Sequence, residues 1–333
     1  MDRVRWGIIG CGDVTEVKSG PALQRAAGSE LVAVMRRTGA LAEDYARRHG
    51  VPKWTDNADA LIHDPDVNAI YIATPPDTHC EYTLRAADAG KPVYVEKPMA
   101  RTYAECQTMI AACHAAGVPL FVAYYRRALP RFVKIKELID AGATGEVRAV
   151  HMQLFDDARP DPSALPWRYR PEIAGGGLFV DLGAHMIDFL IYALGPIVAA
   201  HGDAGNQTGR YPAEDIVSGS FTFASGAHGT GLWWFSSPQR ADFTEIYGTE
   251  GTLRYACFDN APVILRRGGH EERFVIDHPP HVQQPLIQTV VDTLLGGGPC
   301  PSTGETAAET NRVMDQLLAG YRARRGEGHV LRS

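Results

Sequence analysis

The feature that most constrains the fold is a regular alternation of strand-type and helix-type segments over residues 4–123. Short apolar runs rich in Val and Ile are followed by longer segments of helical periodicity, and Gly or Pro marks most of the junctions. Consecutive parallel strands need such crossover helices, so the pattern predicts an α/β domain with a doubly wound parallel sheet. Its expected strands span residues 4–9, 30–35, 69–74, 93–96 and 118–123.

The periodicity changes beyond a helix expected at residues 130–141, where short strand-type runs are joined by tight turns. This meander predicts an α+β domain with a large, mostly antiparallel sheet. A chain of 333 residues is long enough for two domains, which we place at residues 1–123 and 124–333, with the C-terminal helices able to pack back on the first domain. The expected strands span residues 147–155, 216–223, 229–235, 243–247, 252–257 and 263–267.

The composition excludes several classes of protein. Hydrophobic residues at 45% and charged residues at 22% are typical of a folded globular chain, and a net charge of −6 argues against a nucleic-acid or anionic-membrane partner. No apolar run is expected to span a membrane, and no signal peptide is expected at the amino terminus. Six cysteines without C-x-x-C spacing indicate buried thiols in a reducing, cytoplasmic location, and no metal-ligand cluster is predicted.

A glycine turn follows the first strand. In Gly10-Cys11-Gly12 the backbone amides, with those of Asp13 and Val14, can approach a pyrophosphate. The full G-x-G-x-x-G pattern is not met, because Thr15 stands at the third glycine position. Since many strand–helix turns contain two glycines, this motif alone predicts a dinucleotide site only weakly.

The end of the second strand indicates which dinucleotide is preferred. An NAD enzyme usually has Asp or Glu there to accept from the ribose 2′-hydroxyl, whereas Arg suits a 2′-phosphate. This chain has Arg36-Arg37-Thr38 and no acid. A solvated charged turn is the alternative interpretation. We predict NADP(H) as the cofactor, with NAD(H) as the second choice.

Two further strand ends carry polar side chains. The strand at 93–96 ends on Glu96-Lys97-Pro98, and the strand at 69–74 runs into Thr74-Pro75. Ligands bind at the carboxyl ends of strands in open α/β sheets. A lysine at this position can donate or accept a proton, although a surface ion pair with Glu96 would also explain it.

An apolar run at residues 178–194 predicts a buried helix in the second domain. Asp181, His185 and Asp188 lie on it at i, i+4 and i+7, and a buried carboxylate and imidazole need partners. This favours a pair that lines a pocket over a solvated polar stripe. In the later sheet, Trp233 and Trp234 should face opposite sides, and an open apolar face predicts a homodimer or homotetramer formed through the sheet.

Taken together, these residues resemble the glucose–fructose oxidoreductase / inositol dehydrogenase / rhizopine-catabolism family (Gfo/Idh/MocA). The resemblance implies a Rossmann domain, a nicotinamide cofactor and a catalytic trio of Lys97, Asp181 and His185, with a cis bond before Pro98. It also implies that Trp167-Arg168 reaches the cofactor. The matching residues are Gly10, Gly12, Thr74, Pro75, His79, Glu96, Lys97, Pro98, Gly175, Gly176, Gly177, Asp181 and His185.

One position departs from the family pattern. Tyr125 stands where many members have Asn, so a substrate cannot be carried over from the inositol dehydrogenases. The resemblance implies a dehydrogenase or reductase of sugars, polyols or cyclitols, with Tyr125, Asp181 and His185 at the substrate. A non-sugar carbonyl or a trans-dihydrodiol as substrate, or a nucleotide-sensing regulator without turnover, remain the alternatives.

Overall fold

The computed structural model describes residues 1–326, which form two compact units. Unit 1 comprises Met1–Ala100, Glu105–Leu129 and His278–Ala308. Unit 2 comprises Arg101–Ala104, Pro130–Asp277 and, among the described residues, 309–326. Unit 1 therefore extends past residue 123, where the sequence placed the boundary, and it includes a segment from near the end of the chain.

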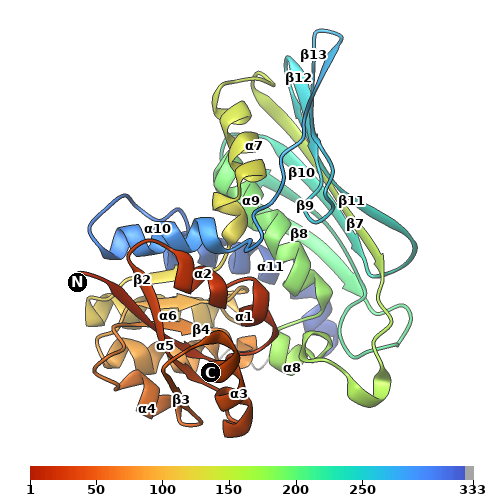
Figure 1. Ribbon diagram of the computed structural model, residues 1–333. Helices are drawn as coiled ribbons and strands as arrows, with labels where there is room; N and C mark the ends of the chain where they lie inside the picture. Colours follow the sequence, from red (N-terminus) through yellow and green to blue (C-terminus); the bar gives the residue numbers. More distant parts are fainter. Residues whose placement is uncertain (327–333) are drawn as a thin grey trace. The chain divides into compact units, whose positions relative to one another are not determined.

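Unit 1 is built on a six-stranded parallel sheet, as the alternation of strands and helices predicts (Figure 1). The order β3-β2-β1-β4-β5-β6 runs outward in both directions from the neighbouring strands β1 and β4. Strand β3 was not predicted, because three residues are too few to show a period. The strands are β1 (Val4–Ile9), β2 (Ser29–Met35), β3 (Lys53–Thr55), β4 (Ala69–Ile72), β5 (Val93–Val95) and β6 (Leu120–Val122).

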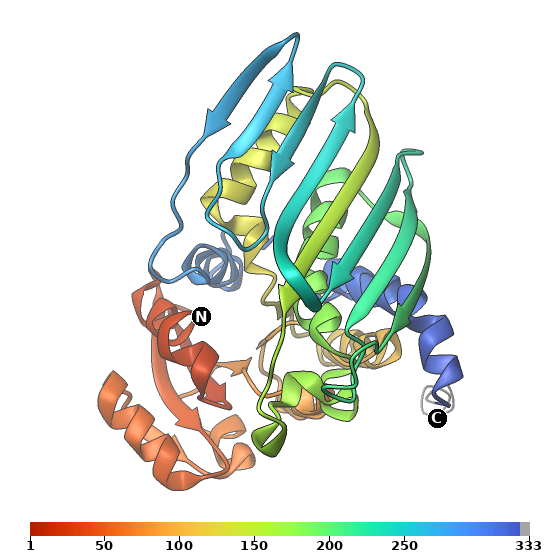
Figure 2. The same ribbon diagram turned by 90° about the vertical axis from the view of Figure 1, so that its right-hand side faces the viewer.

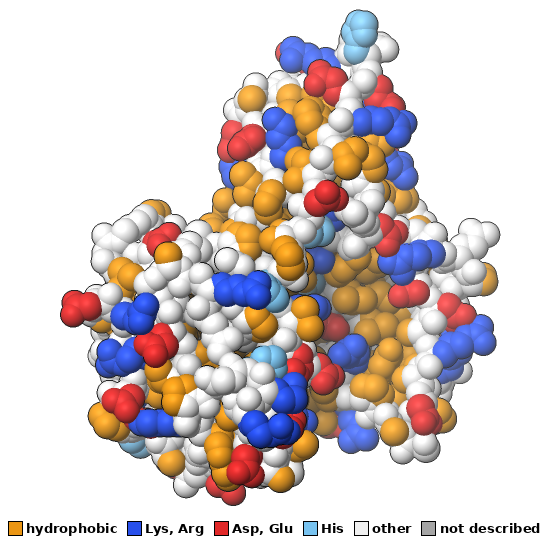
Figure 3. All heavy atoms as spheres, viewed as in Figure 1, with side chains coloured by type: hydrophobic (Ala, Val, Ile, Leu, Met, Phe, Trp, Pro, Cys, Tyr) orange, Lys and Arg blue, Asp and Glu red, His pale blue; other side chains and the backbone are white. Residues whose placement is uncertain are grey.

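Helices connect these strands. The first crossover consists of two short helices, and the second begins at Gly20, where a Cβ would lie 2.2 Å from the Tyr45 hydroxyl and 2.3 Å from the Thr15 carbonyl oxygen. Basic side chains gather over α3 (Figure 3). The helices are α1 (Asp13–Val17), α2 (Gly20–Arg25), α3 (Gly39–His49), α4 (Ala58–Ile62), α5 (His79–Asp88), α6 (Tyr103–Ala116) and, from the late segment, α10 (Gln284–Leu294).

Unit 2 is built on an eight-stranded sheet with the order β14-β13-β12-β11-β7-β10-β9-β8. All neighbours are antiparallel except β7 and β10, which confirms the expected sheet. Strands β8 and β14 were not predicted. The strands are β7 (Val147–Asp157), β8 (Ile197–Gly205), β9 (Ile216–Phe223), β10 (His228–Trp234), β11 (Ser236–Gly248), β12 (Gly251–Tyr255), β13 (Val263–Arg267) and β14 (His270–Phe274).

Helices of unit 2 cover one face of this sheet and leave the other open (Figure 2). Trp233 is fully buried, whereas Trp234 is half-buried and donates to the Ser236 hydroxyl at 2.7 Å, so the two indoles face opposite sides as predicted. Phe189 packs edge-on against Phe132 under the covered face. The helices are α7 (Pro130–Asp140), α8 (Pro171–Ala174), α9 (Ala184–Leu194) and α11 (Gly304–Arg324), which begins in unit 1.

The apolar run of unit 2 differs from the single helix expected at residues 178–194. A π-helical turn, Phe179–Gly183, comes first, and α9 continues from Ala184. By length and composition, Pro171–Leu194 could cross a membrane, contrary to the expectation from the sequence, but most of its apolar window is buried inside the protein. That burial marks it as a core segment of unit 2.

Candidate functional site

The carboxyl edge of the parallel sheet in unit 1 collects most of the predicted cofactor residues. Because all six strands are parallel, the segments that follow them leave the sheet at the same edge. Gly10 and Gly12 follow β1, Arg36 follows β2, Thr74 follows β4 and Lys97 follows β5. The strand order reverses between β1 and β4, the position at which open α/β sheets bind their ligands.

The glycine turn needs its two glycines for different reasons. Gly10 has φ +91°, and a Cβ there would lie 2.7 Å from Thr74 Cγ2, so the backbone and the close approach to β4 both require glycine. At Gly12 a Cβ would meet only the Gly10 carbonyl oxygen, at 3.8 Å. Packing within the protein therefore does not explain Gly12. The open space beside it fits a bound group that approaches the backbone closely.

Thr15 takes the place of the third glycine and closes the turn. Its side chain is fully buried. The Gly12 amide donates to Thr15 Oγ1 at 3.0 Å, and the same hydroxyl donates to the Gly12 carbonyl oxygen at 2.8 Å. The departure from the full glycine pattern thus adds a side-chain brace across the turn.

The basic segment after β2 lies beside this turn. Arg36 is half-buried, and its Nη1 donates to the Cys11 carbonyl oxygen at 3.4 Å. Arg37 and Thr38 are exposed, and Thr38 is the N-cap of α3. Burial raises the pKa of the Cys11 thiol to about 11, so this cysteine is a neutral packing residue. The guanidinium of Arg36 therefore brings a positive charge to the glycine turn.

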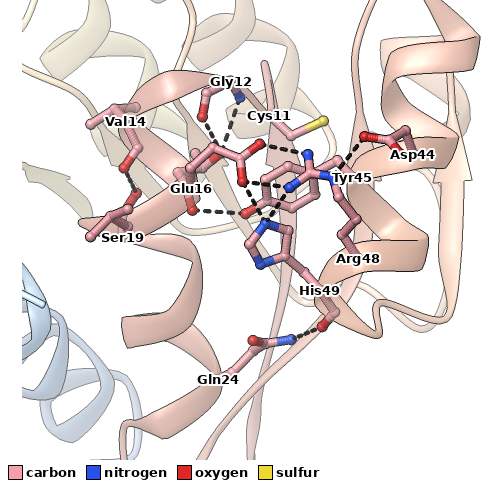
Figure 4. A network of polar contacts seen from close by, with 12 residues as sticks. Cys11, Gly12, Val14, Glu16, Ser19, Gln24, Asp44, Tyr45, Arg48 and His49 are labelled. Carbon is pink, nitrogen blue, oxygen red and sulfur yellow. Dashed lines mark hydrogen bonds and ion pairs between the residues drawn. The ribbon is translucent and has the colours of Figure 1, made fainter.

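A second layer of contacts ties α1 to α3 near the turn (Figure 4). Glu16 accepts from Arg48 Nη2 at 2.7 Å and lies 2.7 Å from His49 Nε2, and the hydrogen bond from Arg48 lowers the pKa of Glu16 to about 2. His49 stacks on Tyr45 with ring centroids 4.2 Å apart, and the Tyr45 hydroxyl donates to the Thr15 carbonyl oxygen at 2.9 Å. These contacts fix the helix that carries the turn.

His79 joins two of the loops at the carboxyl edge. It is fully buried, with Nε2 2.8 Å from the Thr74 carbonyl oxygen and Nδ1 3.1 Å from that of Pro98. Burial lowers the pKa of His79, against the opposing influence of these carbonyls and of Glu96. The side chain holds the Thr74 loop to the loop that carries Lys97. Direct contact between His79 and a cofactor stays a prediction.

Glu96 is the centre of a buried polar network at the end of β5. Its carboxylate accepts from the Tyr71 hydroxyl at 2.7 Å and from Gln283 Nε2 at 2.6 Å. The Tyr94 hydroxyl donates to Gln283 Oε1 at 3.0 Å. All four side chains are buried, so the network has few competing waters and each bond is strong. Gln283 was not predicted, because nothing local distinguishes it from other polar residues near the start of a helix.

Lys97 follows directly on this network. Its backbone amide donates to Glu96 Oε2 at 3.2 Å, its side chain is half-buried, and the Lys97–Pro98 bond is cis, as the resemblance implied. The main chain at Lys97 is thus held by Glu96, while His79 holds the next residue from the other side. This arrangement presents a lysine from a rigid strand end.

Tyr125, the predicted substrate residue, belongs to unit 1 rather than to the second domain. It begins a 3-10 turn, Tyr125–Ala128, after β6 and is buried, with the Arg126 guanidinium 5.1 Å from its ring centroid. It therefore follows the strand next to β5 in the sheet.

In unit 2 the predicted acid and imidazole lie on consecutive helical turns. Asp181 is half-buried on the π-helical turn, and His185 is buried in the first turn of α9. Asp188 is also buried and accepts from the Thr310 hydroxyl at 3.2 Å, so it packs against α11. The wider π-helical turn separates Asp181 from the regular stripe that the sequence predicts, and such turns are frequent at functional sites.

Two aromatic residues beside this pair were missed from the sequence. Tyr169 follows Trp167 and Arg168 in a 3-10 turn, and its pKa is raised by burial, with the charge of Asp181 adding to the rise. The Arg168 guanidinium lies 5.6 Å from the Trp167 ring centroid. Phe258 lies on the loop after β12, with its ring centroid 6.0 Å from that of His185. Both residues lie in irregular segments, where no periodicity of polar and apolar residues indicates which side chains approach Asp181 or His185.

Over residues 1–326 no group of three or more His, Cys, Asp or Glu side chains could hold a metal ion. Within the same range none of the six cysteines forms a disulfide.

Comparison with known families matches both halves of the chain. Residues 4–124 match the family model described as an oxidoreductase family with an NAD-binding Rossmann fold. Residues 132–254 match the model of the GFO/IDH/MocA C-terminal domain.

Two relatives and one solved structure align over nearly the whole length of the chain. The oxidoreductase P35 of Formosa agariphila is 39% identical over 316 residues, which cover 94% of this chain and 98% of that protein. The 1,5-anhydro-D-fructose reductase of Ensifer adhaerens is 30% identical, with 90% and 91% covered. The crystal structure of an aldose-aldose oxidoreductase from Caulobacter crescentus complexed with glycerol superposes with a TM-score of 0.85 at 27% identity, covering 98% of each chain.

Proposed function

The chain belongs to the Gfo/Idh/MocA family of oxidoreductases, and we propose that it transfers a hydride between NADP(H) and the carbinol or carbonyl carbon of a sugar, polyol or cyclitol. The observation that carries the proposal is the carboxyl edge of the parallel sheet, where a buried carboxylate network lies at Lys97 after β5 and the glycine turn after β1 has open space at Gly12. The substrate class is proposed from the names of the relatives, which include an anhydrofructose reductase.

The residues of this chain have to orient the substrate and move one proton, because the bound nicotinamide supplies the hydride chemistry. In oxidation, the imidazole of His185 takes the hydroxyl proton while the hydride leaves the same carbon, and the proton then passes to solvent. Lys97 donates a hydrogen bond to the reacting oxygen, and Asp181 orients His185. In reduction, His185 or Lys97 gives the proton to the carbonyl oxygen.

The preference for NADP(H) is supported by Arg36. Its guanidinium lies at the glycine turn, and its segment, Arg36-Arg37-Thr38, offers no carboxylate to a ribose 2′-hydroxyl. A guanidinium can pair with a 2′-phosphate through two hydrogen bonds. Arg36 therefore discriminates in favour of the phosphorylated cofactor.

The catalytic assignment is tested by Lys97→Ala and His185→Ala. Turnover should fall roughly 10²-fold or more in each, while the affinity for NADP⁺ changes little. The substrate for these assays is identified by testing a panel of sugars, polyols and cyclitols with NADP⁺ and measuring turnover at the absorbance of the reduced nicotinamide. Near wild-type turnover in both variants contradicts the assignment. NADP⁺ binding without turnover of any compound in the panel favours a regulator instead.

Matched controls separate these effects from the general loss of a basic side chain. Lys91 also adjoins β5, on its amino-terminal side, and its ammonium donates to the Asp64 carbonyl oxygen at 2.8 Å. His151 lies on the open face of the unit 2 sheet, 3.0 Å from the Thr230 hydroxyl. Lys91→Ala and His151→Ala should keep the wild-type turnover.

The cofactor assignment is tested by direct titration of Arg36→Ser with NADP⁺ and NAD⁺. Loss of the charged hydrogen bonds should raise the Kd for NADP⁺ about 10-fold to 100-fold and leave that for NAD⁺ nearly unchanged. Arg47→Ser is the control, because Arg47 lies on the exposed side of α3 and pairs with Asp44. Equal losses for both cofactors, or tighter binding of NAD⁺ by the wild-type protein, would refute the preference.

A further inference from the structure

The loop between β12 and β13 reaches the imidazole of His185. Phe258 on this loop lies with its ring centroid 6.0 Å from that of His185, and the two ring planes are inclined at 74°. His185 is buried and Phe258 is half-buried. An edge-to-face arrangement of this kind is attractive and directional. The phenyl ring therefore restricts the orientations open to the imidazole.

The amide groups of the loop are bound by one carboxylate. Asp242 on β11 accepts from the backbone N–H of three successive residues, Cys257 at 2.9 Å, Phe258 at 2.6 Å and Asp259 at 2.7 Å. Hydrogen bonds from backbone amides to an ionised carboxylate are about twice as strong as neutral ones. The main chain at Phe258 is thus fixed through its donors.

The carbonyl groups of the same loop are bound by a buried arginine. Arg131 on α7 is fully buried, and its Nη1 donates to the carbonyl oxygens of Asp259 at 2.9 Å and Ala261 at 3.3 Å. Arg240 pairs with the Asp259 carboxylate at 2.5 Å. A segment without regular secondary structure is therefore held from β11, from α7 and through its own acidic side chain.

From this geometry we propose that Phe258 is a positioning residue for His185, and that Asp242 acts on the reaction through Phe258. The inference rests on the proposed function, in which His185 moves the proton. The phenyl ring holds the imidazole in the orientation that proton transfer needs and keeps water from one side of it. Errors of about 1 Å in such an orientation can reduce turnover by up to roughly 10²-fold.

The test uses the full-length protein with Phe258→Ala, Phe258→Leu and Asp242→Asn. In Phe258→Ala, kcat should fall about 10-fold with the affinity for NADP⁺ unchanged, and the pH profile of kcat should shift. Phe258→Leu should recover part of the loss, because it restores bulk without the ring. Asp242→Asn should give changes of the same kind and smaller size. Phe274→Ala, on β14 under the Lys134 ammonium, is the matched control.

A second readout does not depend on turnover. The ring-proton resonances of His185, assigned by their absence in His185→Ala, should move in Phe258→Ala, because the phenyl ring current is lost. Unmoved resonances or a wild-type kcat and pH profile in Phe258→Ala, with activity lost in His185→Ala, overturn this inference alone. Full turnover in His185→Ala overturns the proposed function, and this inference with it. If Phe258→Ala fails to fold, the same readouts on Phe258→Leu decide.

Discussion

Lys97 in unit 1 and His185 in unit 2 lie beside different kinds of packing, a buried polar network in one case and aromatic rings in the other. Around Lys97 the support is polar and buried: the Glu96 carboxylate binds Tyr71 and Gln283. Beside His185 lies the phenyl ring of Phe258, and further along α9 the packing is aromatic, between Phe189 and both Phe132 and Tyr255. A hydrogen-bonded network is directional and its members depend on one another, whereas apolar packing yields gradually when volume changes.

The largest loss of stability is expected when the buried polar network around Glu96 is disrupted. Glu96→Leu leaves the buried Gln283 amide without its carboxylate acceptor, at a cost of about 1–3 kcal/mol. It also removes the charged hydrogen bond of the Tyr71 hydroxyl, which keeps only Ser19 Oγ at 3.0 Å, at a further cost of about 1.5–3 kcal/mol. We expect the free energy of unfolding to fall by about 3 kcal/mol or more in urea titrations.

Coupling within the network sharpens the same prediction. The double variant Glu96→Leu/Gln283→Leu should lose less stability than the sum of the two single variants, by about 1 kcal/mol or more. If the losses in the free energy of unfolding are additive, the hydrogen bonds of the network are independent, and the network does not differ in this respect from the aromatic packing of unit 2.

A smaller effect is expected from the aromatic side. Phe189 packs edge-on against Phe132 at 4.9 Å and against Tyr255 at 5.7 Å between ring centroids. Phe189→Leu keeps an apolar side chain in the core and should cost about 1–1.5 kcal/mol in the free energy of unfolding. A loss as large as that of Glu96→Leu would mean that this packing is as specific as the polar network.

The smallest expected effect is a dependence of the stability of unit 1 on pH. Because burial lowers the pKa of His79, the neutral imidazole stabilises the folded state above the ordinary pKa of 6.5, and this stability is lost as the pH falls below it. Between pH 7 and pH 5.5 the Tm of the wild-type protein should fall further than that of His79→Gln, by roughly 2 to 4 °C. His151→Gln serves as the control, and equal falls for His79→Gln and the wild-type protein would contradict the assignment.

The sequence predicted the elements whose patterns are local. Lys97 could be placed because a short apolar strand ends on it, and His185 because a polar side chain inside an apolar run needs a partner. Both sheets were confirmed. The catalytic roles stay predictions.

The sequence could not indicate contacts between residues far apart in the chain. It also could not indicate a π-helical turn inside a segment of helical periodicity. Gln283 meets Glu96 across 187 positions, and Phe258 meets His185 from a loop, so no periodicity records either contact. The π-helical turn at Phe179–Gly183 has the same apolar composition as an α-helix. Strand β8 has β-branched residues only at its first two positions and is otherwise rich in Ala and Gly, and β14 is largely charged and has none, so neither shows the composition that marks strands.

The segment His278–Ala308 of unit 1 has a consequence for folding during synthesis. Glu96 leaves the ribosome 187 residues before Gln283, an interval on the order of ten to forty seconds at ordinary rates of synthesis. During that time the nascent amino-terminal half lacks the amide that its central carboxylate binds. Folding of unit 1 is therefore completed only after residues 278–308 have been synthesised, and a fragment released before residue 278 would carry this defect permanently.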